Sequence, residues 1–385
     1  MTVPTDTSIR GDVDEGYGPV ADVFRDNFRS RGDVGAAVVV YLDGRRVVDL
    51  CGGVADHRSG RPWTPETPAV VFSCTKGLLA ICAYLLVQQG RLDLDAPVTR
   101  YWPGFERAGK ADIPVRSLLT HRAGLPALDR AMTRDDVLAW QPVIEAIEAQ
   151  APLWQPGSAY SYHALTYGWL VGEVIHRVTG VLPGEFFRAA IGDPLGLRTW
   201  IGLPRQEQAT VAWTLAPPGE PMSFPDQVSE RSLTMGGAFD FPADSDGLVS
   251  FNDPAIQAAG IPGAGGVSSA EGLARLYSAC VSGTAGPRLL TDASVADAIV
   301  VRSQGQQRYG WADAGQRWGT GFLLGSPGVR PMLGERSFGH DGAGGHLAFG
   351  DDSYRVGFAY VINQMGGPDD DRANRLTAAL RARLG

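Results

Sequence analysis

Lysine is almost absent from this chain of 385 residues. Among its 34 basic residues only Lys76 and Lys110 are lysines, and 42 acidic residues give a formal net charge of −8. Nucleic acids and anionic membranes attract basic surfaces, and this chain contains no basic run. The sequence therefore predicts that neither a nucleic acid nor a membrane is its partner.

Cysteines are few and long apolar runs are absent. The four cysteines have no metal-ligand spacing, and Cys74 and Cys82 lie in one predicted helix at a separation unsuited to a disulfide. We expect reduced thiols, as in a cytoplasmic protein. Residues 1–12 lack the charged and apolar regions of a signal peptide, and the apolar runs 36–42 and 78–87 are too short to span a bilayer.

Two families of catalytic pattern are also missing. The motif Gly-x-Ser-x-Gly does not occur, which argues against an α/β-hydrolase with a Ser-His-Asp triad. The histidines show no spacing typical of a metal site, so we expect no metal and no cofactor. We expect structural roles for His121, His163 and His346.

The stretch that remains to be explained is residues 71–87. Ser73 and Lys76 stand three residues apart at the start of a predicted helix, so their side chains share one face. The apolar run 78–87 indicates that this helix is buried, and burial lowers the pKa of a lysine until it can accept a proton from serine. Ser73 could instead be an ordinary helix cap. The retention of lysine in an arginine-rich chain favours catalysis, because arginine cannot release its proton.

Two further stretches carry candidate residues. Tyr162 lies in a turn, where a nearby cationic lysine could drive its phenol toward phenolate; the alternative is a buried ring with a solvated hydroxyl. Residues 338–346 are rich in glycine at the end of a predicted strand. A backbone N–H there could bind an oxyanion, or the segment could be a simple hairpin turn.

The distribution of elements predicts an α+β fold in one domain, 1–385. Predicted strands at 36–42 and 46–51 are joined by a turn at Asp43-Gly44, and later strands are predicted near 320–324, 336–339, 347–350 and 356–362. These strands should form one antiparallel sheet, flanked by helices at 17–31 and 370–384. Residues 17–72 and 285–385 would form the α/β lobe and 73–284 the helical lobe, with Ser73 at the junction.

The helical lobe itself has recognisable segments. Helices are expected over 134–149, broken at Pro142, and over 164–179, 183–191 and 269–281. Residues 200–262 show little periodicity and are predicted to form a lid or pocket wall.

Taken together, the three stretches resemble the serine β-lactamase and penicillin-binding-protein superfamily over residues 20–385. Ser73-Cys74-Thr75-Lys76 matches its Ser-x-x-Lys motif. Tyr162-His163-Ala164 stands where class C enzymes have Tyr-x-Asn, and His340-Asp341-Gly342 stands where many members have Lys-Thr-Gly. The resemblance implies a β-lactamase-like fold.

The departures from those motifs point to one branch of the superfamily. Ala164 replaces the asparagine, and His340 replaces a permanent cation with a group that is mostly neutral at pH 7. A β-lactam or peptidyl substrate offers a carboxylate that such a cation would bind. The pattern therefore resembles the family VIII carboxylesterases and related acyltransferases.

That resemblance implies a hydrolase of carboxylic esters with short to medium acyl chains, acting through an acyl-enzyme on Ser73. Lys76 and Tyr162 would share the general-base role, and the N–H groups of Ser73 and Ala343 would bind the oxyanion. His340, Gly342 and the segment 200–262 would line the pocket for a small-molecule ester. The alternatives are an acyltransferase, a β-lactamase or D-Ala-D-Ala peptidase-like enzyme, and a binding homologue without catalysis. The sequence does not indicate the oligomeric state.

Overall fold

A long antiparallel sheet forms one side of the molecule. The structure is a computed structural model that describes residues 9–219, 223–244, 247–283, 288–367 and 369–385. The strands of the whole structure are β1 (Arg10–Val13), β2 (Gly35–Leu42), β3 (Arg45–Asp56), β4 (Arg61–Pro62), β5 (Ala69–Val70), β6 (Thr199–Ile201), β7 (Gly266–Ser268), β8 (Arg317–Trp318), β9 (Leu323–Leu324), β10 (Ser337–Gly342), β11 (His346–Asp351) and β12 (Val356–Ile362).

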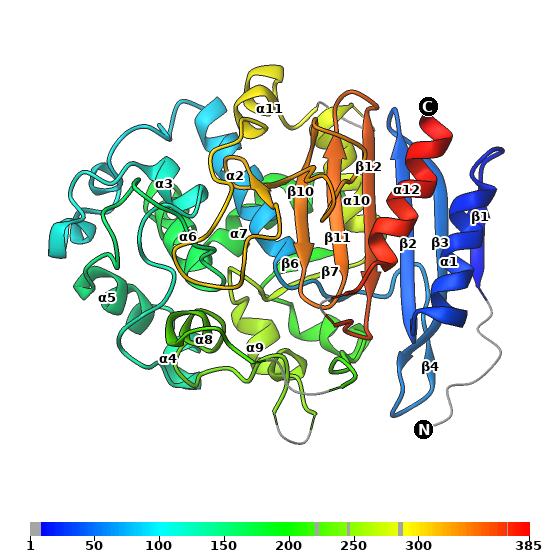
Figure 1. Cartoon of the computed structure of the whole chain (residues 1–385), viewed down its shortest axis with the longest axis horizontal. Helices are drawn as coiled ribbons and strands as arrows, with labels where there is room; N and C mark the ends of the chain where they lie inside the picture. The colour runs from blue at the N-terminus through cyan, green and yellow to red at the C-terminus, as the bar shows by residue number, and fades with distance from the viewer. Residues whose placement is uncertain (1–8, 220–222, 245–246, 284–287, 368) are drawn as a thin grey trace.

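Helices flank this sheet and fill the other side of the molecule (Figure 1). They are α1 (Gly18–Ser30), α2 (Cys74–Gln88), α3 (Val115–Leu119), α4 (Arg134–Leu138), α5 (Gln141–Ala149), α6 (Thr166–Thr179), α7 (Pro183–Phe187), α8 (Gln227–Thr234), α9 (Pro254–Ala259), α10 (Ala270–Val281), α11 (Asp292–Ala298) and α12 (Arg372–Leu384). Shorter 3-10 or π turns are η1 (Val98–Arg100), η2 (Pro103–Gly109), η3 (Arg188–Gly192), η4 (Arg205–Thr210) and η5 (Ser250–Asn252).

The strand order confirms the predicted sheet of early and late strands. The main sheet runs β1-β3-β2-β12-β11-β10-β9-β8, and β4 pairs with β3 at the side. Asp43 and Gly44 have φ values of 52° and 78°, as a two-residue hairpin turn between right-twisted strands requires. Strand β1 was not predicted, because its residues are mostly exposed and lack an apolar alternation.

Both faces of the sheet are covered, as the alternation within β2 shows. Val38 and Val40 point into a core that includes α1 and α12, whereas Ala37 and Val39 point into the larger core that includes α2 and α10. Figure 1 shows α1 and α12 on the same side of the sheet. Helix α10 approaches closely at Gly357, where a Cβ would lie 2.2 Å from the carbonyl oxygen of Ala274.

The packing of α10 changes the predicted boundary between the lobes. We placed residues 73–284 in the helical lobe, but α10 packs against β2, β11 and β12. Its apolar face is therefore buried by the sheet, and only the helices before it belong with the helical lobe. Helix α2 lies between the two regions, in contact with α6 and with β10 (Figure 1).

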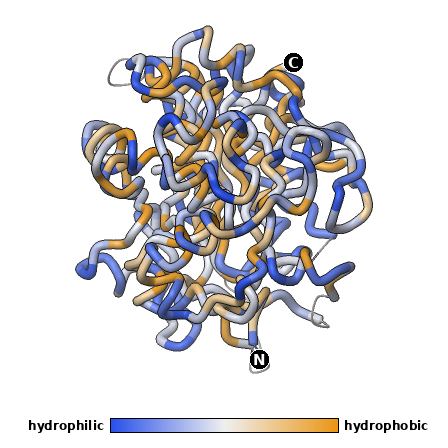
Figure 2. The backbone as a smooth tube through the Cα atoms, turned by 90° about the vertical axis from the view of Figure 1, so that its left-hand side faces the viewer, coloured by the Kyte–Doolittle hydropathy of each residue, from blue (hydrophilic) through white to orange (hydrophobic). Residues whose placement is uncertain are grey.

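The helical lobe largely follows the predicted segments. The predicted break near Pro142 is confirmed, with α4 ending at Leu138 and α5 beginning at Gln141. Gly180 ends α6 in the left-handed conformation, with φ of 84°. The segment 200–262 is not one loop, because α8 and α9 form within it. Figure 2 shows apolar segments running through the interior of this side and hydrophilic segments mostly at its periphery.

The two lysines are both buried. Lys110 donates hydrogen bonds to the carbonyl oxygens of Arg107 at 2.7 Å, Glu148 at 3.0 Å and Gln150 at 2.6 Å. An ammonium has three donors and here satisfies two carbonyls at the end of α5 and one in η2, so the second lysine has a structural explanation. Lys76 differs, because its Nζ contacts one hydroxyl and one carbonyl.

Other expectations concern the cysteines and the membrane. Cys51, Cys74, Cys82 and Cys280 are buried free thiols. Within the described ranges, no helix has the length and hydropathy needed to cross a bilayer. The expectation that the chain lacks a signal peptide was based on residues 1–12, and residues 1–8 lie outside the described residues.

Candidate active site

The first element of the site is the strained entry into α2. Phe72 has φ of 45°, in the left-handed region that non-glycine residues rarely occupy. Its ring is held by Phe251, with ring centres 5.3 Å apart, and by His346 at 5.9 Å. Residues 74–83 are buried, whereas Ser73 is partly exposed. The turn at Phe72 thus presents the Ser73 hydroxyl at the start of a buried helix, and strain of this kind is typical of functional sites.

Lys76 is the central charged group. It is 0% exposed, and its Nζ lies 2.9 Å from Ser73 Oγ and 2.8 Å from the carbonyl oxygen of Gly263. Burial lowers the pKa of Lys76 to about 7, against the opposing effects of the Asp341 and Cys74 side chains. Near neutral pH a large fraction of Lys76 is therefore uncharged and able to accept a proton from Ser73.

Glycines allow the Gly263 carbonyl to reach Lys76. A Cβ on Gly168 of α6 would lie 2.1 Å from the backbone nitrogen of Gly263, so the loop before β7 can pack directly on that helix. The same loop is fixed to α2 by Thr75, whose Oγ1 accepts a hydrogen bond from the Gly266 N–H at 2.8 Å. The glycine-rich stretch 263–266 thus supplies the second partner of the lysine.

Tyr162 lies on the loop before α6 and contacts Ser73. Its hydroxyl donates to Ser73 Oγ at 2.9 Å, and its backbone N–H donates to Gln307 Oε1 at 2.7 Å. The ring stacks on Trp318, with centres 5.1 Å apart, and lies 4.8 Å from the His121 ring. These contacts fix the phenol beside the serine.

The shift toward phenolate considered for Tyr162 from the sequence is opposed by its burial. Burial raises the pKa of Tyr162 well above its ordinary value of 10, although the hydrogen bond with Ser73 acts in the opposite direction. Tyr162 is therefore a neutral phenol when Lys76 is uncharged. Of the two groups that contact Ser73 Oγ, Lys76 is the one with a pKa near neutrality.

The neighbouring histidines have structural partners. His163 Nε2 accepts a hydrogen bond from the Leu125 N–H at 3.1 Å, and His121 Nδ1 accepts one from the His163 N–H at 3.1 Å. Burial lowers the pKa of His163 to about 4 and that of His121 well below 6.5. Both rings are therefore neutral and support the loop that carries Tyr162.

The end of β10 supplies the third side of the site. A Cβ on Gly342 would lie 2.3 Å from the carbonyl oxygen of Val71, so this glycine lets β10 approach the start of α2. Cys74 Sγ also donates to the His340 carbonyl at 3.3 Å. Within the described ranges, neither the Ser73 N–H nor the Ala343 N–H has a hydrogen-bond partner. Both are available to a developing oxyanion.

His340 stands where the family resemblance expects the lysine of Lys-Thr-Gly, but it does not replace the charge of that lysine. Its ring is 1% exposed, and Nδ1 lies 2.7 Å from the Asp341 carbonyl oxygen, to which a protonated Nδ1 donates. Nε2 is buried without a partner in the described part of the chain. Burial lowers the pKa of His340, although Asp341 beside it acts in the opposite direction. This position is therefore neutral near pH 7.

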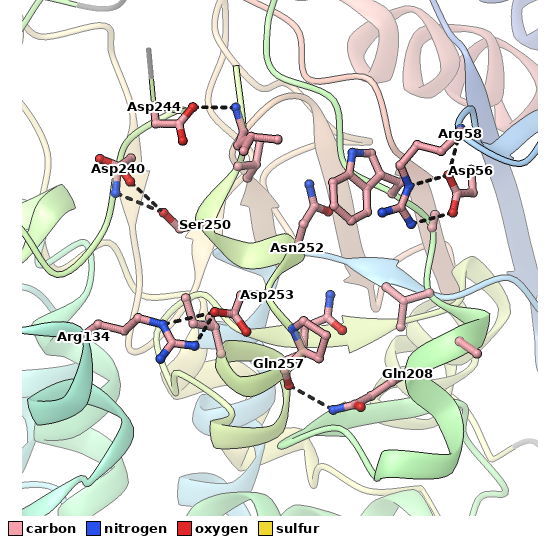
Figure 3. A pocket seen from close by; sticks show the side chains of 18 of the residues that line it. Asp56, Arg58, Arg134, Gln208, Asp240, Asp244, Ser250, Asn252, Asp253 and Gln257 are labelled. Atoms are coloured by element: carbon pink, nitrogen blue, oxygen red, sulfur yellow. Dashed lines mark hydrogen bonds and ion pairs between the residues drawn. The ribbon is translucent and has the colours of Figure 1, made fainter. Parts of the chain in front are cut away.

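One cavity in the described part of the chain lies away from Ser73. It has a volume of about 640 Å3, and its lining includes Asp56, Arg58, Trp213 and Asp253 but none of the predicted site residues. Figure 3 shows the paired charges of Asp56 with Arg58 and of Arg134 with Asp253 along it. Most of its lining comes from the segment 200–262, which we expected to line the pocket of Ser73.

Several residues of this site were not predicted. The Gly263 carbonyl, which contacts Lys76, and Gln307 and Trp318, which contact Tyr162, lie far from Ser73 in the sequence and come near it only in the folded chain. A backbone carbonyl has no residue signature, and an aromatic ring that packs on Tyr162 resembles any other core aromatic residue. The nearest signal was the glycine cluster 263–266.

Comparison with known proteins agrees with this geometry. Residues 22–382 match the family described as Beta-lactamase. The chain is similar to the protein named Esterase/beta-lactamase LipL of Mycobacterium tuberculosis, with 33% identity over 369 residues that cover 93% of this chain and 83% of that protein.

Two solved structures share the fold over nearly the whole chain. A penicillin-binding protein homologue from Caulobacter crescentus has a TM-score of 0.88 and 34% identity, covering 98% of this chain and 100% of its own. A family VIII carboxylesterase has a TM-score of 0.85 and 32% identity, with the same coverage of 98% and 100%. The chain therefore belongs to the β-lactamase family of serine hydrolases, as the resemblance of its three motifs predicted.

Proposed function

We propose that this protein is a serine hydrolase of carboxylic esters that acts through an acyl-enzyme on Ser73. The observation that carries the proposal is the position of Ser73 Oγ, 2.9 Å from both Lys76 Nζ and the Tyr162 hydroxyl. At the level of the family, the esterase name of LipL and the carboxylesterase structure support ester hydrolysis.

Acylation would begin with neutral Lys76. Its lone pair accepts the proton of Ser73 as Oγ attacks the ester carbonyl carbon, and the N–H groups of Ser73 and Ala343 bind the oxyanion. The tetrahedral intermediate then collapses and the alkoxide leaves. Tyr162 gives its proton to the alkoxide. The Lys76 ammonium, 4.9 Å from the Tyr162 ring centre, stabilises the phenolate that results.

Deacylation would restore both groups. The Tyr162 phenolate takes a proton from water, and the remaining hydroxide adds to the acyl carbon. When the acid product departs, Ser73 Oγ leaves as an alkoxide and takes back the proton held by Lys76. The phenolate thus arises only between the two steps, when Lys76 is charged, as the expectation of a cationic lysine beside the phenol required.

The neutral third motif supports esters as substrates. A substrate with a carboxylate would meet the neutral, buried His340 ring where related enzymes place a cation. An ester needs no such partner. Short to medium acyl chains remain our prediction, and a lactamase activity, which the name of LipL includes for that protein, is the second candidate.

A substrate panel with Ser73→Ala tests this proposal. We expect wild-type protein to hydrolyse p-nitrophenyl acetate, butyrate or octanoate faster than it opens a chromogenic cephalosporin. Ser73→Ala should lower kcat/KM for esters by about 10^4-fold or more, since the nucleophile is lost. Its unfolding free energy should change little, because the Ser73 side chain makes no capping hydrogen bond.

Ser269→Ala is the matched control for the helix-cap alternative. The Ser269 hydroxyl does cap α10, accepting a hydrogen bond from the Gly272 N–H at 3.0 Å. Its loss should cost about 1 kcal/mol in urea unfolding and leave ester turnover near wild type. Faster cephalosporin opening than ester hydrolysis would make the protein a lactamase. Ester turnover that survives in Ser73→Ala would show that the nucleophile is another residue.

The pH dependence should report the titration of Lys76. Protonated Lys76 cannot accept a proton, so kcat/KM should fall about tenfold per pH unit below the pKa of about 7 and level off above it. The pKa of Tyr162 lies well above 10, so no alkaline loss is expected below pH 10. Initial rates from pH 5 to pH 10 measure this profile. A rate that is constant from pH 5 to pH 8 in the wild type would contradict a lysine base.

Tyr162→Phe tests the proton donor. Removal of the hydroxyl should lower kcat by about 10^2-fold or more, because the alkoxide must leave without a proton. The ring still stacks on Trp318, so stability should be retained. Tyr167→Phe is the control. The Tyr167 ring centre also lies near Lys76, 5.9 Å from its Nζ, but the Tyr167 hydroxyl makes only a 3.5 Å contact with the Lys76 carbonyl oxygen. If the kcat of Tyr162→Phe equalled that of Tyr167→Phe, Tyr162 would have no role as the proton donor.

A further inference from the structure

The turn that carries Ala343 is built from glycines with unusual conformations. Gly344 and Gly345 join β10 to β11 with φ of 86° and 115°, and the Gly345 N–H donates to the Gly342 carbonyl at 3.1 Å. Glycine loses more conformational entropy on ordering than any other residue. A donor N–H in such a turn keeps its position only if other groups fix the turn.

The segment that follows β12 packs directly on this turn. A Cβ on Gly344 would lie 2.7 Å from the Cγ of Met365, and the Gly366 N–H donates to the Gly344 carbonyl at 2.8 Å. A Cβ on Gly345 or on Gly366 would lie 2.2 Å from Asp370 Oδ2. The turn therefore rests on Asp370 and on the residues just before α12.

One side chain joins these parts. Arg372, in the first turn of α12, is 2% exposed, and its Nη2 donates to the carbonyl oxygens of Gly344 at 2.9 Å and Gln364 at 3.0 Å. Its Nε donates to Asp370 Oδ1 at 2.9 Å, and its Nη1 donates to Asp33 Oδ1 at 2.6 Å. Only a guanidinium, with its planar fork of donors, can bind all these acceptors together.

The burial of this cluster calls for an explanation beyond stability. Both partners of the ion pair between Asp33 and Arg372 are buried, with side chains 0% and 2% exposed. Removing both charges from water costs free energy that their attraction often fails to recover, so a buried ion pair is weak evidence for stabilisation. A role in fixing the neighbouring turn would account for its presence.

We infer that Arg372 is a positioning residue that holds the Gly344 carbonyl, and through it the Ala343 N–H, in the geometry that the oxyanion requires. The inference rests on the proposed function, in which Ala343 is an oxyanion donor. Arg372 touches no reacting group and acts only through the turn. Asp33 and Asp370 fix the guanidinium, and the segment after β12 fixes the turn from the same side.

The position of a donor matters because its effect depends on the distance to the oxyanion. Loss of one oxyanion donor costs about 10^2 to 10^3 in kcat in a well-studied hydrolase. Displacement of the donor should give a smaller loss of the same kind. The loss should fall on kcat and not on KM, because the interaction forms in the transition state.

Arg372→Lys is the direct test, since it keeps the charge beside Asp33 and Asp370 but loses the fork. We expect kcat for p-nitrophenyl butyrate to fall about tenfold or more, with KM and the pH midpoint of the rate unchanged, because the base is untouched. Hydrogen exchange of the peptide containing residues 343–345, followed by mass spectrometry, should become faster. Arg116→Lys is the control: Arg116 pairs with Asp95 at 2.6 Å and Asp297 at 2.8 Å, away from the turn, and should change neither result.

The outcomes separate this inference from the proposed function. Wild-type kcat and unchanged exchange at 343–345 in a folded Arg372→Lys would overturn the positioning role. If that variant does not fold, Asp370→Asn decides, because it weakens one support of the guanidinium and leaves the Asp33 pair intact. Unchanged kcat and exchange there would also overturn it. Ester hydrolysis that is absent in the wild type, or present in Ser73→Ala, would instead overturn the proposed function, and the exchange result would still decide the role of Arg372 in the turn.

Discussion

The burial of one amine beside one hydroxyl is the constraint on which the site depends. Lys76 Nζ is removed from water and held between Ser73 Oγ and the Gly263 carbonyl. A lysine in water would be charged at neutral pH and could not accept a proton. Desolvation by the surrounding core lowers its pKa to about 7, so the same packing that forms the interior of the protein also produces the group that we propose as the base.

The rest of the fold brings separate parts of the chain to this pair. The start of α2 provides Ser73 and Lys76, the loop before α6 provides Tyr162, and the turn after β10 carries the Ala343 N–H that we propose as an oxyanion donor. Two close approaches around the pair depend on positions where only glycine fits. Gly342 admits β10 to the start of α2, and Gly168 admits the loop that carries Gly263. In the mechanism that we propose, the two charge states of Lys76 determine when Tyr162 can give or accept a proton, because the ammonium stabilises a phenolate that the neutral amine does not.

Some of this could be predicted from the sequence because its cause is local. Ser73 and Lys76 share a helix face through their spacing, and the strands at 36–42 and 356–362 are marked by continuous apolar residues. The family resemblance located Tyr162 and the glycine turn. The protonation state of Tyr162 could not be predicted, because it depends on burial among His121, Trp318 and His340. The Gly263 carbonyl and the Arg372 cluster were equally hidden, since both depend on contacts between residues far apart in the chain.

The scarcity of lysine makes the central claim directly measurable. Protein labelled with 13C at the lysine ε-carbon should show two signals, from Lys76 and Lys110, and Lys76→Arg assigns them. We predict that the Lys76 signal titrates with a pKa of about 7, below that of Lys110 at about 8. A Lys76 titration near the ordinary lysine value of about 10.4 would show that the amine stays charged at neutral pH, and would contradict its role as the base.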